Sequence, residues 1–144
     1  MERMYYLMRK LHLMNVPFLP RLIMLLIRFL YNSFIPPETS IGKNVSFGHK
    51  LGIVLHRKAV IGDRVRIRHQ VTMGSGGAKI GNDVDVGCGA KLIGNIVVGD
   101  RVKIGANAVV VKDVPSDVVV VGIPAKIVRT DKPNTHSRNL DSES

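Results

Sequence analysis

The second half of the chain places an aliphatic residue at every sixth position. The series begins at Ile80 and continues through Val86, Leu92, Val98, Ile104 and Val110. Four residues after each member comes a second small or branched apolar residue: Val84, Ala90, Ile96, Val102, Ala108 and Val114. An α-helix repeats about every 3.6 residues and a strand about every 2, so neither alone keeps a six-residue period. The period is typical of a parallel β-helix, an all-β solenoid whose short strands form the faces of a coiled prism.

The same period extends upstream with two interruptions. The earlier runs are Ile41, Phe47, Ile53 and then Ile61, Ile67, Met73, with inner partners Val45, Leu51, Val65 and Val71. The step from Ile53 to Ile61 is eight residues, and the step from Met73 to Ile80 is seven. Because solenoids expel insertions as loops, often on the binding face, we expect loops within 49–58 and 73–79. Three hexapeptides complete one triangular turn, so residues 41–115 predict roughly four coils stacked about 4.8 Å apart.

The ends of the chain differ from the repeat. Prolines divide the apolar stretches 4–14 and 19–34, which predict two helices within an N-terminal segment 1–37. We expect these helices to cap the open first coil, which a solenoid needs for solubility. The alternative is an Arg-bearing amphipathic helix lying on a membrane surface; the second stretch is too short and too charged for a confident membrane span. The β-helix is predicted over 38–129, and 130–144 is expected to be a disordered polar tail.

Composition narrows the range of partners. The formal net charge of +10 favours an anionic partner, but no nucleic-acid motif or aromatic stacking set accompanies the scattered bases. A phosphate-bearing cofactor or an anionic membrane therefore fits, and no nucleic acid is expected. The single cysteine, Cys88, excludes an intrachain disulfide and suits a reducing cytoplasm, so we expect a cytoplasmic protein, with the inner membrane face as an alternative location.

Three histidines, His49, His56 and His69, lie in or beside the first interruption. His49 is in a glycine-flanked stretch where a corner of the backbone can hold an imidazole outward. Stacked coils bring residues about 18 positions apart into register, so His49 and His69 are predicted to project from neighbouring layers toward one groove. We take His49 and His69 as the catalytic candidates and His56 as the weaker one. A solvent-exposed histidine without a role is the alternative for each.

Two further segments could bind a ligand. Glycines in the loop Gly74-Ser75-Gly76 allow close approach of a ligand and present backbone N–H groups, which could hold an oxyanion. The alternative is a simple turn that accommodates the extra residue. Near the C-terminus Lys112, Lys126 and Arg129 gather positive charge, as a ledge for phosphate or as part of a solubilising cap. No nucleotide fingerprint and no metal-ligand spacing is present.

Three strings carry a family resemblance across roughly residues 33–129: Phe47-Gly48-His49…Gly52-Ile53-Val54, Val71-Thr72-Met73-Gly74 and Ile104-Gly105-Ala106…Val121-Gly122-Ile123-Pro124-Ala125. With them the chain resembles the hexapeptide-repeat acyltransferases, in particular the serine acetyltransferase-like branch. The resemblance implies a left-handed parallel β-helix, a homotrimer with active sites between subunits, and transfer of an acetyl group from acetyl-CoA to a hydroxyl.

The resemblance also assigns roles to individual residues. His49 matches the general base that takes the proton of the acceptor hydroxyl. Gly74 and its neighbours match the loop that lines the thioester and pantetheine. Ala90 and Ala106 match small positions beside the pantetheine arm. Residues that would meet the nucleotide end of coenzyme A are Lys112, Lys126 and Arg129.

The chain also departs from the family pattern. Phe34 stands where serine acetyltransferases carry the acidic residue that orients the histidine; Glu38, Asp63 or a backbone carbonyl could substitute. An Arg-His-Pro loop that helps to recognise serine is absent, and the helical segment is short and basic. These departures favour a sugar or exopolysaccharide precursor as acceptor, with serine as the alternative. A rival of another class is a non-catalytic scaffold, or a metal-binding solenoid that uses His49, His56 and His69; we expect no metal.

Overall fold

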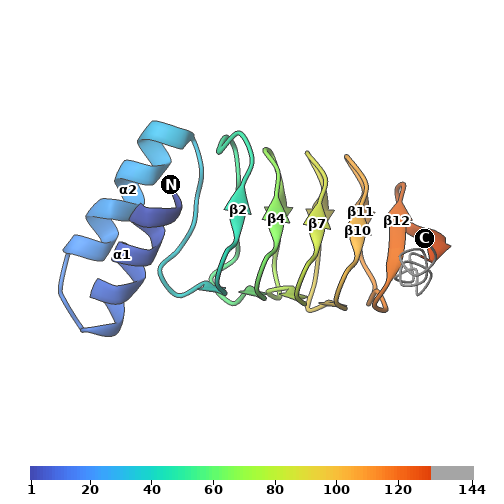
Figure 1. Ribbon diagram of the computed structural model, residues 1–144. Helices are drawn as coiled ribbons and strands as arrows, with labels where there is room; N and C mark the ends of the chain where they lie inside the picture. The colour runs from blue at the N-terminus through green and yellow to red at the C-terminus, as the bar shows by residue number, and fades with distance from the viewer. Residues whose placement is uncertain (131–144) are drawn as a thin grey trace, which may run out of the picture.

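The computed structural model describes residues 1–130, so the predicted tail lies, apart from Thr130, outside the described residues. Two helices, α1 (Glu2–Leu13) and α2 (Leu19–Tyr31), lie across one end of a stack of coils. Figure 1 shows the coils following one another along a single axis, with β12 at the end opposite the helices. Within residues 1–130, no helix is long and apolar enough to cross a membrane.

Three parallel sheets form the faces of the prism. The first face is β1 (Ser40–Ile41), β3 (Val60–Ile61), β6 (Lys79–Ile80) and β9 (Val97–Val98). The second face is β2 (Ser46–Phe47), β4 (Arg66–Ile67), β7 (Asp85–Val86), β10 (Lys103–Ile104), β12 (Val118–Val121) and, antiparallel to β12, β13 (Lys126–Thr130). The third face is β5 (Thr72–Met73), β8 (Lys91–Leu92) and β11 (Val109–Val110), and bridges from Val54 to Phe34 and Thr72 extend it.

The six-residue period corresponds to the inward residue of each strand. The twelve residues of the predicted series are all buried, and with them the inner partners, except Leu51, which is 52% exposed. The second residue of each two-residue strand points inward because successive side chains of a strand alternate between its faces. The all-β solenoid with a helical cap that the period predicts is therefore confirmed.

The first interruption lies within the expected range 49–58, but its two extra residues come before Ile53, whereas the eight-residue step puts them after it. The N–H of Gly48 donates to the carbonyl oxygen of Ile67, as the N–H of Arg68 donates to that of Val86 one coil further along. The N–H of Gln70 donates to the carbonyl oxygen of Leu51. Leu51 is therefore the counterpart of His69, and His49 and Lys50 are the two extra residues. Consistent with this register, Val54 rather than Ile53 pairs with Thr72, and Leu55 is the inward residue of the third face. Leu51 is exposed because it lies in this enlarged corner.

The second interruption is where the sequence places it. One extra residue enlarges the turn 74–77, and the backbone passes close to neighbouring coils there. A Cβ on Gly76 would lie 2.5 Å from the N atom of Asn95, and one on Gly77 would lie 2.6 Å from the backbone of Lys58. Both glycines have a positive φ, so the turn needs glycine for space and for conformation.

The three faces meet at three corners, which we name by their contents. The ladder corner joins the first face to the second (residues 42–45, 62–65, 81–84 and 99–102). The histidine corner joins the second face to the third (48–53, 68–71, 87–90 and 105–108). The glycine-loop corner joins the third face to the first (56–59, 74–78, 93–96 and 111–113). Apart from the insertion at 49–50, the first two corners use four-residue turns whose third residue has a positive φ.

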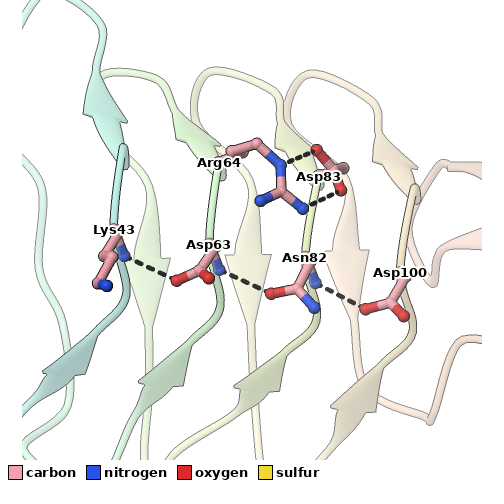
Figure 2. A network of polar contacts seen from close by, with 6 residues as sticks. All are labelled: Lys43, Asp63, Arg64, Asn82, Asp83 and Asp100. Atoms are coloured by element: carbon pink, nitrogen blue, oxygen red, sulfur yellow. Dashed lines mark hydrogen bonds and ion pairs between the residues drawn. The ribbon is translucent and has the colours of Figure 1, made fainter.

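Side chains hold the register of the coils at the ladder corner (Figure 2). The backbone N–H of Lys43 donates to Asp63, that of Asp63 to Asn82, and that of Asn82 to Asp100, over distances of 2.7 to 2.8 Å. Ser116 accepts the last N–H of the series, from Asp100, at 2.8 Å. These bonds satisfy backbone donors that would otherwise have only water, and they connect every pair of adjacent coils.

The N-terminal helices attach to the first coil through α1. Tyr5 donates its hydroxyl hydrogen to the carbonyl oxygen of Thr39, to which Arg9 also donates, and Tyr6 donates to the carbonyl of Gly42 at 2.5 Å. Tyr5 and Met8 are buried against the open end of the prism. The helix α2 packs on α1, so the hairpin covers the apolar end of the first coil.

Candidate active site

The histidine corner brings the two catalytic candidates together. His49 and Lys50 both have a positive φ, of 56° and 36°, so the inserted pair bulges from the corner and leaves His49 exposed. The ring of His69, one coil further along, meets the ring of His49 edge to face, with centroids 5.5 Å apart. The structure thus places the two histidines on neighbouring layers, as the sequence predicts.

His69 contains an unusual polar atom. Its Nδ1 is buried and has no hydrogen-bond partner, and no other buried side-chain nitrogen or oxygen within residues 1–130 lacks one. An unpaired buried polar atom costs free energy and is uncommon in folded proteins, so it calls for an explanation. Its position behind an exposed imidazole is consistent with a role in positioning His49.

Backbone donors also line the histidine corner. The second residues of its regular turns are His69, Cys88 and Ala106, and their N–H groups have no hydrogen-bond partner within the described chain. At the ladder corner the equivalent N–H groups are occupied by side chains of the next coil. The histidine corner therefore presents a column of N–H donors along the prism axis, which suits a ligand with several acceptor groups.

Glu2 is the acidic residue that braces this corner. One carboxylate oxygen accepts the N–H of Phe47 at 3.2 Å, and the other lies 3.1 Å from the Nζ of Lys50. Burial raises the pKa of Glu2, but hydrogen bonds from backbone N–H groups and from Lys50 outweigh it, so the pKa lies below its ordinary value. Glu2 therefore fixes one of the two inserted residues to α1.

The residues considered as substitutes for an orienting acid lie elsewhere. Phe34 is half-buried and extends the third face beside Val54. Glu38 precedes the first strand and is exposed, and Asp63 is bonded to Lys43 at the ladder corner. None of these hydrogen bonds reaches His49. No sequence pattern points to Glu2, because it lies far from the repeat and reaches the corner only through the packing of α1.

The predicted cofactor-binding residues lie in four places: the glycine-loop corner, the histidine corner, the C-terminal hairpin and the core. Gly74, Ser75, Gly76 and Lys112 lie on the glycine-loop corner, whereas Ala106 is exposed on the histidine corner. Lys126 and Arg129 are exposed on β13. Ala90 is completely buried in the core, so packing explains why that residue is small, and its side chain does not line a surface groove.

The three histidines of the metal hypothesis do not converge. His56 lies on the glycine-loop corner, where its Nδ1 accepts the N–H of Lys58 at 3.2 Å. It is therefore separated by the third face from His49 and His69. Within residues 1–130, no group of three or more histidine, cysteine, aspartate or glutamate side chains could hold a metal ion.

Two hollows adjoin these corners. The larger, of about 790 Å³, lies between the helical hairpin and the third face and reaches Gly74 and Ser75. Its charged lining includes Arg21, Glu38 and Arg57, of which only Arg57 was not singled out by the sequence patterns. The smaller, of about 230 Å³, lies beside the histidine corner and is lined by Arg68, Cys88, Lys103 and Ala106, among others.

Relatives and solved structures can now be compared with this geometry. The serine acetyltransferase of Synechococcus elongatus is 41% identical over 145 residues, which cover 92% of this chain and 59% of that protein. The serine acetyltransferase of Helicobacter pylori is 41% identical over 135 residues, which cover 89% of this chain and 79% of that protein. No family model matches the chain.

Two solved structures share the fold. A serine acetyltransferase in complex with CoA is 37% identical, with a TM-score of 0.83, over 87% of this chain and 54% of that one. The Neisseria gonorrhoeae serine acetyltransferase in complex with serine is 35% identical, with a TM-score of 0.81, over 85% of this chain and 53% of that one. The chain thus spans little more than half the length of these structures and 59% of the Synechococcus relative.

These matches confirm that the solenoid is the left-handed parallel β-helix of the hexapeptide-repeat acyltransferases. Within that class, the chain belongs to the serine acetyltransferase family.

Proposed function

We propose that the protein is an acetyl-CoA-dependent O-acetyltransferase that uses His49 as its general base. The observation that carries this proposal is the placement of an exposed imidazole on a two-residue insertion, backed by His69 and beside a column of backbone N–H donors. Support for acetyl-CoA comes from the family and from the solved relative in complex with CoA.

The reaction needs a base and a donor for the oxyanion. A neutral His49 takes the proton of the acceptor hydroxyl while the oxygen attacks the thioester carbonyl carbon. The tetrahedral intermediate then collapses, the C–S bond breaks, and the imidazolium returns the proton to the departing thiolate. Gly74 already donates its N–H to Leu92, so the oxyanion donors fall to Ser75 and Gly76, whose N–H groups have no partner within residues 1–130.

These groups can act together only across two copies of the chain. His49 and the loop 74–76 lie on corners at opposite ends of the third face, so they do not share a cleft within one subunit. A cyclic trimer has a heterologous interface, in which the histidine corner of one copy faces the glycine-loop corner of the next. We therefore propose a homotrimer in which each site combines His49 of one subunit with the loop of its neighbour.

Serine is the acceptor that we propose. The relatives and structures described above are serine acetyltransferases, which favours serine over the sugar acceptor that the sequence departures suggested. The larger hollow supports the same choice, because Arg57 suits a carboxylate and Glu38 suits an ammonium group, and both lie beside the proposed oxyanion loop. This pair would replace the Arg-His-Pro loop that the chain lacks.

The primary experiment measures thiol release from acetyl-CoA with serine, a nucleotide sugar or a lipid-linked saccharide as acceptor. We expect turnover with serine, reduced about 10²- to 10⁴-fold in His49→Ala. Lys43→Ala is the control, because Lys43 is exposed on the ladder corner and lines neither hollow, and it should keep most of the activity. Turnover with a saccharide but not with serine would overturn the acceptor, and an active His49→Ala would overturn the base.

Subunit complementation tests the shared site. His49→Ala and Ser75→Phe each remove one half of the proposed cleft, so each variant alone should be inactive. Co-expression of the two chains should restore activity, since mixed trimers contain intact pairs of corners. Two different affinity tags show that the trimers are mixed. If such mixed trimers recovered no activity, a site built between subunits would be contradicted.

A further inference from the structure

We propose that the outer face of α2, together with the α1–α2 connection, docks on the surface of an anionic lipid bilayer. The proposal is independent of the acetyl-transfer reaction. It is based on an apolar helix face that no described residue covers and on the cationic side chains along its edge.

The helix α2 is apolar on both of its sides. Pro20 and Ile27 are buried against α1 and the first coil. Leu22, Leu25 and Phe29 project from the opposite side, and Phe29 is 87% exposed and Leu22 is 62% exposed. A surface helix normally presents polar side chains to water, so this face lacks the expected polar stripe. Further exposed apolar residues of the hairpin are Leu7, Leu13, Met14, Phe18, Leu19, Leu26 and Leu30.

This extent of exposed apolar surface points to a partner. Single exposed apolar side chains are ordinary, but a contiguous apolar face on a helix marks a contact with protein or membrane. The apolar side chains are leucine, methionine and phenylalanine, which insert readily at the boundary between headgroups and acyl chains. The geometry alone leaves both kinds of partner open, and the charges distinguish them.

The charges around the face are of one sign. Arg21 and Arg28 lie seven residues apart on one flank of α2, which contains no acidic residue. Arg21 also borders the larger hollow, and Glu38 in that lining does not pair with it. Lys10 lies on the exposed side of α1, and no carboxylate within residues 1–130 pairs with any of these three cations. Glu2, the only acidic residue of either helix, is occupied by Phe47 and Lys50.

A second copy of the chain fits this surface poorly. Two such faces packed together would place arginines near arginines, with no acid on either face to compensate, and like charges in contact are unfavourable. An anionic bilayer supplies both the apolar interior and the negative headgroups, and each basic residue near such a surface adds about fivefold to the affinity.

The length of α2 indicates how the helix would lie. At about 1.5 Å per residue its 13 residues extend roughly 20 Å, less than the approximately 30 Å of a hydrocarbon core. The helix would therefore lie in the plane of the interface, with its outer face buried and the arginines among the headgroups. The prism would extend away from the membrane, because both helices lie across one end of it (Figure 1).

Vesicle flotation tests the proposal with the full chain. The vesicles are phosphatidylcholine alone or equal parts of phosphatidylcholine and phosphatidylglycerol. We expect flotation only with the anionic vesicles, weakened by added salt. Leu22→Ser with Phe29→Ser should reduce the affinity at least tenfold, and Arg21→Gln with Arg28→Gln about 25-fold, from fivefold for each arginine. Val97→Ser, an exposed apolar residue on the first face, is the control and should float as the wild type does.

Several outcomes would overturn the proposal. They are no flotation with either vesicle, equal flotation with both, or unchanged flotation of the Leu22/Phe29 variant. Light scattering on the same samples tests the alternative that this face binds protein. If the wild type does not bind vesicles and its oligomer loses mass in the Leu22/Phe29 variant, the face is a protein–protein interface. Circular dichroism of each variant confirms that the fold survives.

Discussion

The ladder corner and the histidine corner are built from the same four-residue turn, with a positive φ at the third residue. They differ in the second residue. At the ladder corner Asp63, Asn82 and Asp100 use their side chains to accept an N–H from the preceding coil. At the histidine corner the second residues leave their N–H groups without a partner among the described residues. One backbone geometry can therefore hold the register or present donors to a ligand, depending on one side chain per coil.

The two corners differ in free space only at the turn that contains the insertion. At the ladder corner a Cβ on Gly81 would lie 2.4 Å from the Oδ1 of Asp100 and 2.8 Å from the backbone of Gly99. At the histidine corner a Cβ on Gly48 would meet nothing closer than 3.9 Å. In a regular turn of the histidine corner, however, a Cβ on Gly87 would lie 2.6 Å from the N atom of Ala106, so that turn is as crowded as the one at Gly81. The open space is therefore confined to the turn that contains His49 and Lys50.

Removing the insertion gives the largest expected effect. Deletion of Lys50 and Leu51 would leave His49 directly before Gly52, in the position that His69 occupies in the next coil. We expect a regular corner whose thermal stability falls only by the small contribution of the Glu2–Lys50 contact, but a loss of acetyl transfer of about 100-fold or more, because the imidazole no longer projects from the bulge. Melting by circular dichroism and the thiol-release assay check the two parts. Activity that survives the deletion would mean that the bulge is not needed to present His49.

Crowding the first position of a turn compares a regular turn with the turn that contains the insertion. Gly81→Ala should lower the free energy of unfolding by about 1–3 kcal/mol, because the new methyl group overlaps Asp100 and the Gly99 backbone. Gly48→Ala is the matched control and should change it little. Urea denaturation of the two variants gives the measurement, and equal losses in both would remove the distinction in packing.

Removing one acceptor of the ladder should have a smaller effect. Asn82→Ala leaves the N–H of Asp63 without its side-chain partner, at a cost of about 1 kcal/mol to stability. Cys88→Ala changes the second residue of the other corner in the same coil, where no such bond is lost, and should leave stability unchanged. Urea midpoints decide this comparison. If the cysteine variant lost as much stability as the asparagine variant, the ladder bonds would not be what holds the coils in register.

The smallest effect concerns the brace from α1 to the insertion. The folded-state pKa of Glu2 is depressed, so its carboxylate stabilises the fold above the ordinary pKa, and this contribution is lost as pH falls through the folded value. Glu2→Gln should therefore be less stable than the wild type at neutral pH, by about 0.5 kcal/mol or less because water screens the contact. The difference should vanish in acid. Urea midpoints at both pH values test it, with Glu38→Gln as control, and a difference that grew in acid would contradict the sign.

The sequence predicts the core of this fold well because the period reports burial directly. The range 49–58 contains the first insertion, but the apolar series puts the extra residues after Ile53 for a physical reason: Ile53 is buried whether it is a strand residue or an inner partner of the turn. An apolar period therefore cannot tell whether the two extra residues come before or after Ile53. The exposure of Leu51 and the pairing of Val54 with Thr72 resolve the register.

The candidate site is predictable only in part. The stacking of coils places His49 near His69, and this follows from counting residues. Glu2 reaches the corner through the packing of α1, and Arg57 and Glu38 line one hollow formed with the helical hairpin, so neither placement depends on the period. Ala90 shows the opposite error, since a small residue in a repeat can serve the narrow core as easily as a ligand.

The inserted pair at 49–50 has a consequence for how such a molecule can change over time. The neighbouring coils keep their pairing around it, so a reactive group there is added without replacing any residue of the scaffold. A chain of this design can gain, lose or exchange its chemistry by lengthening or trimming one bend, while the layers on either side remain as they were.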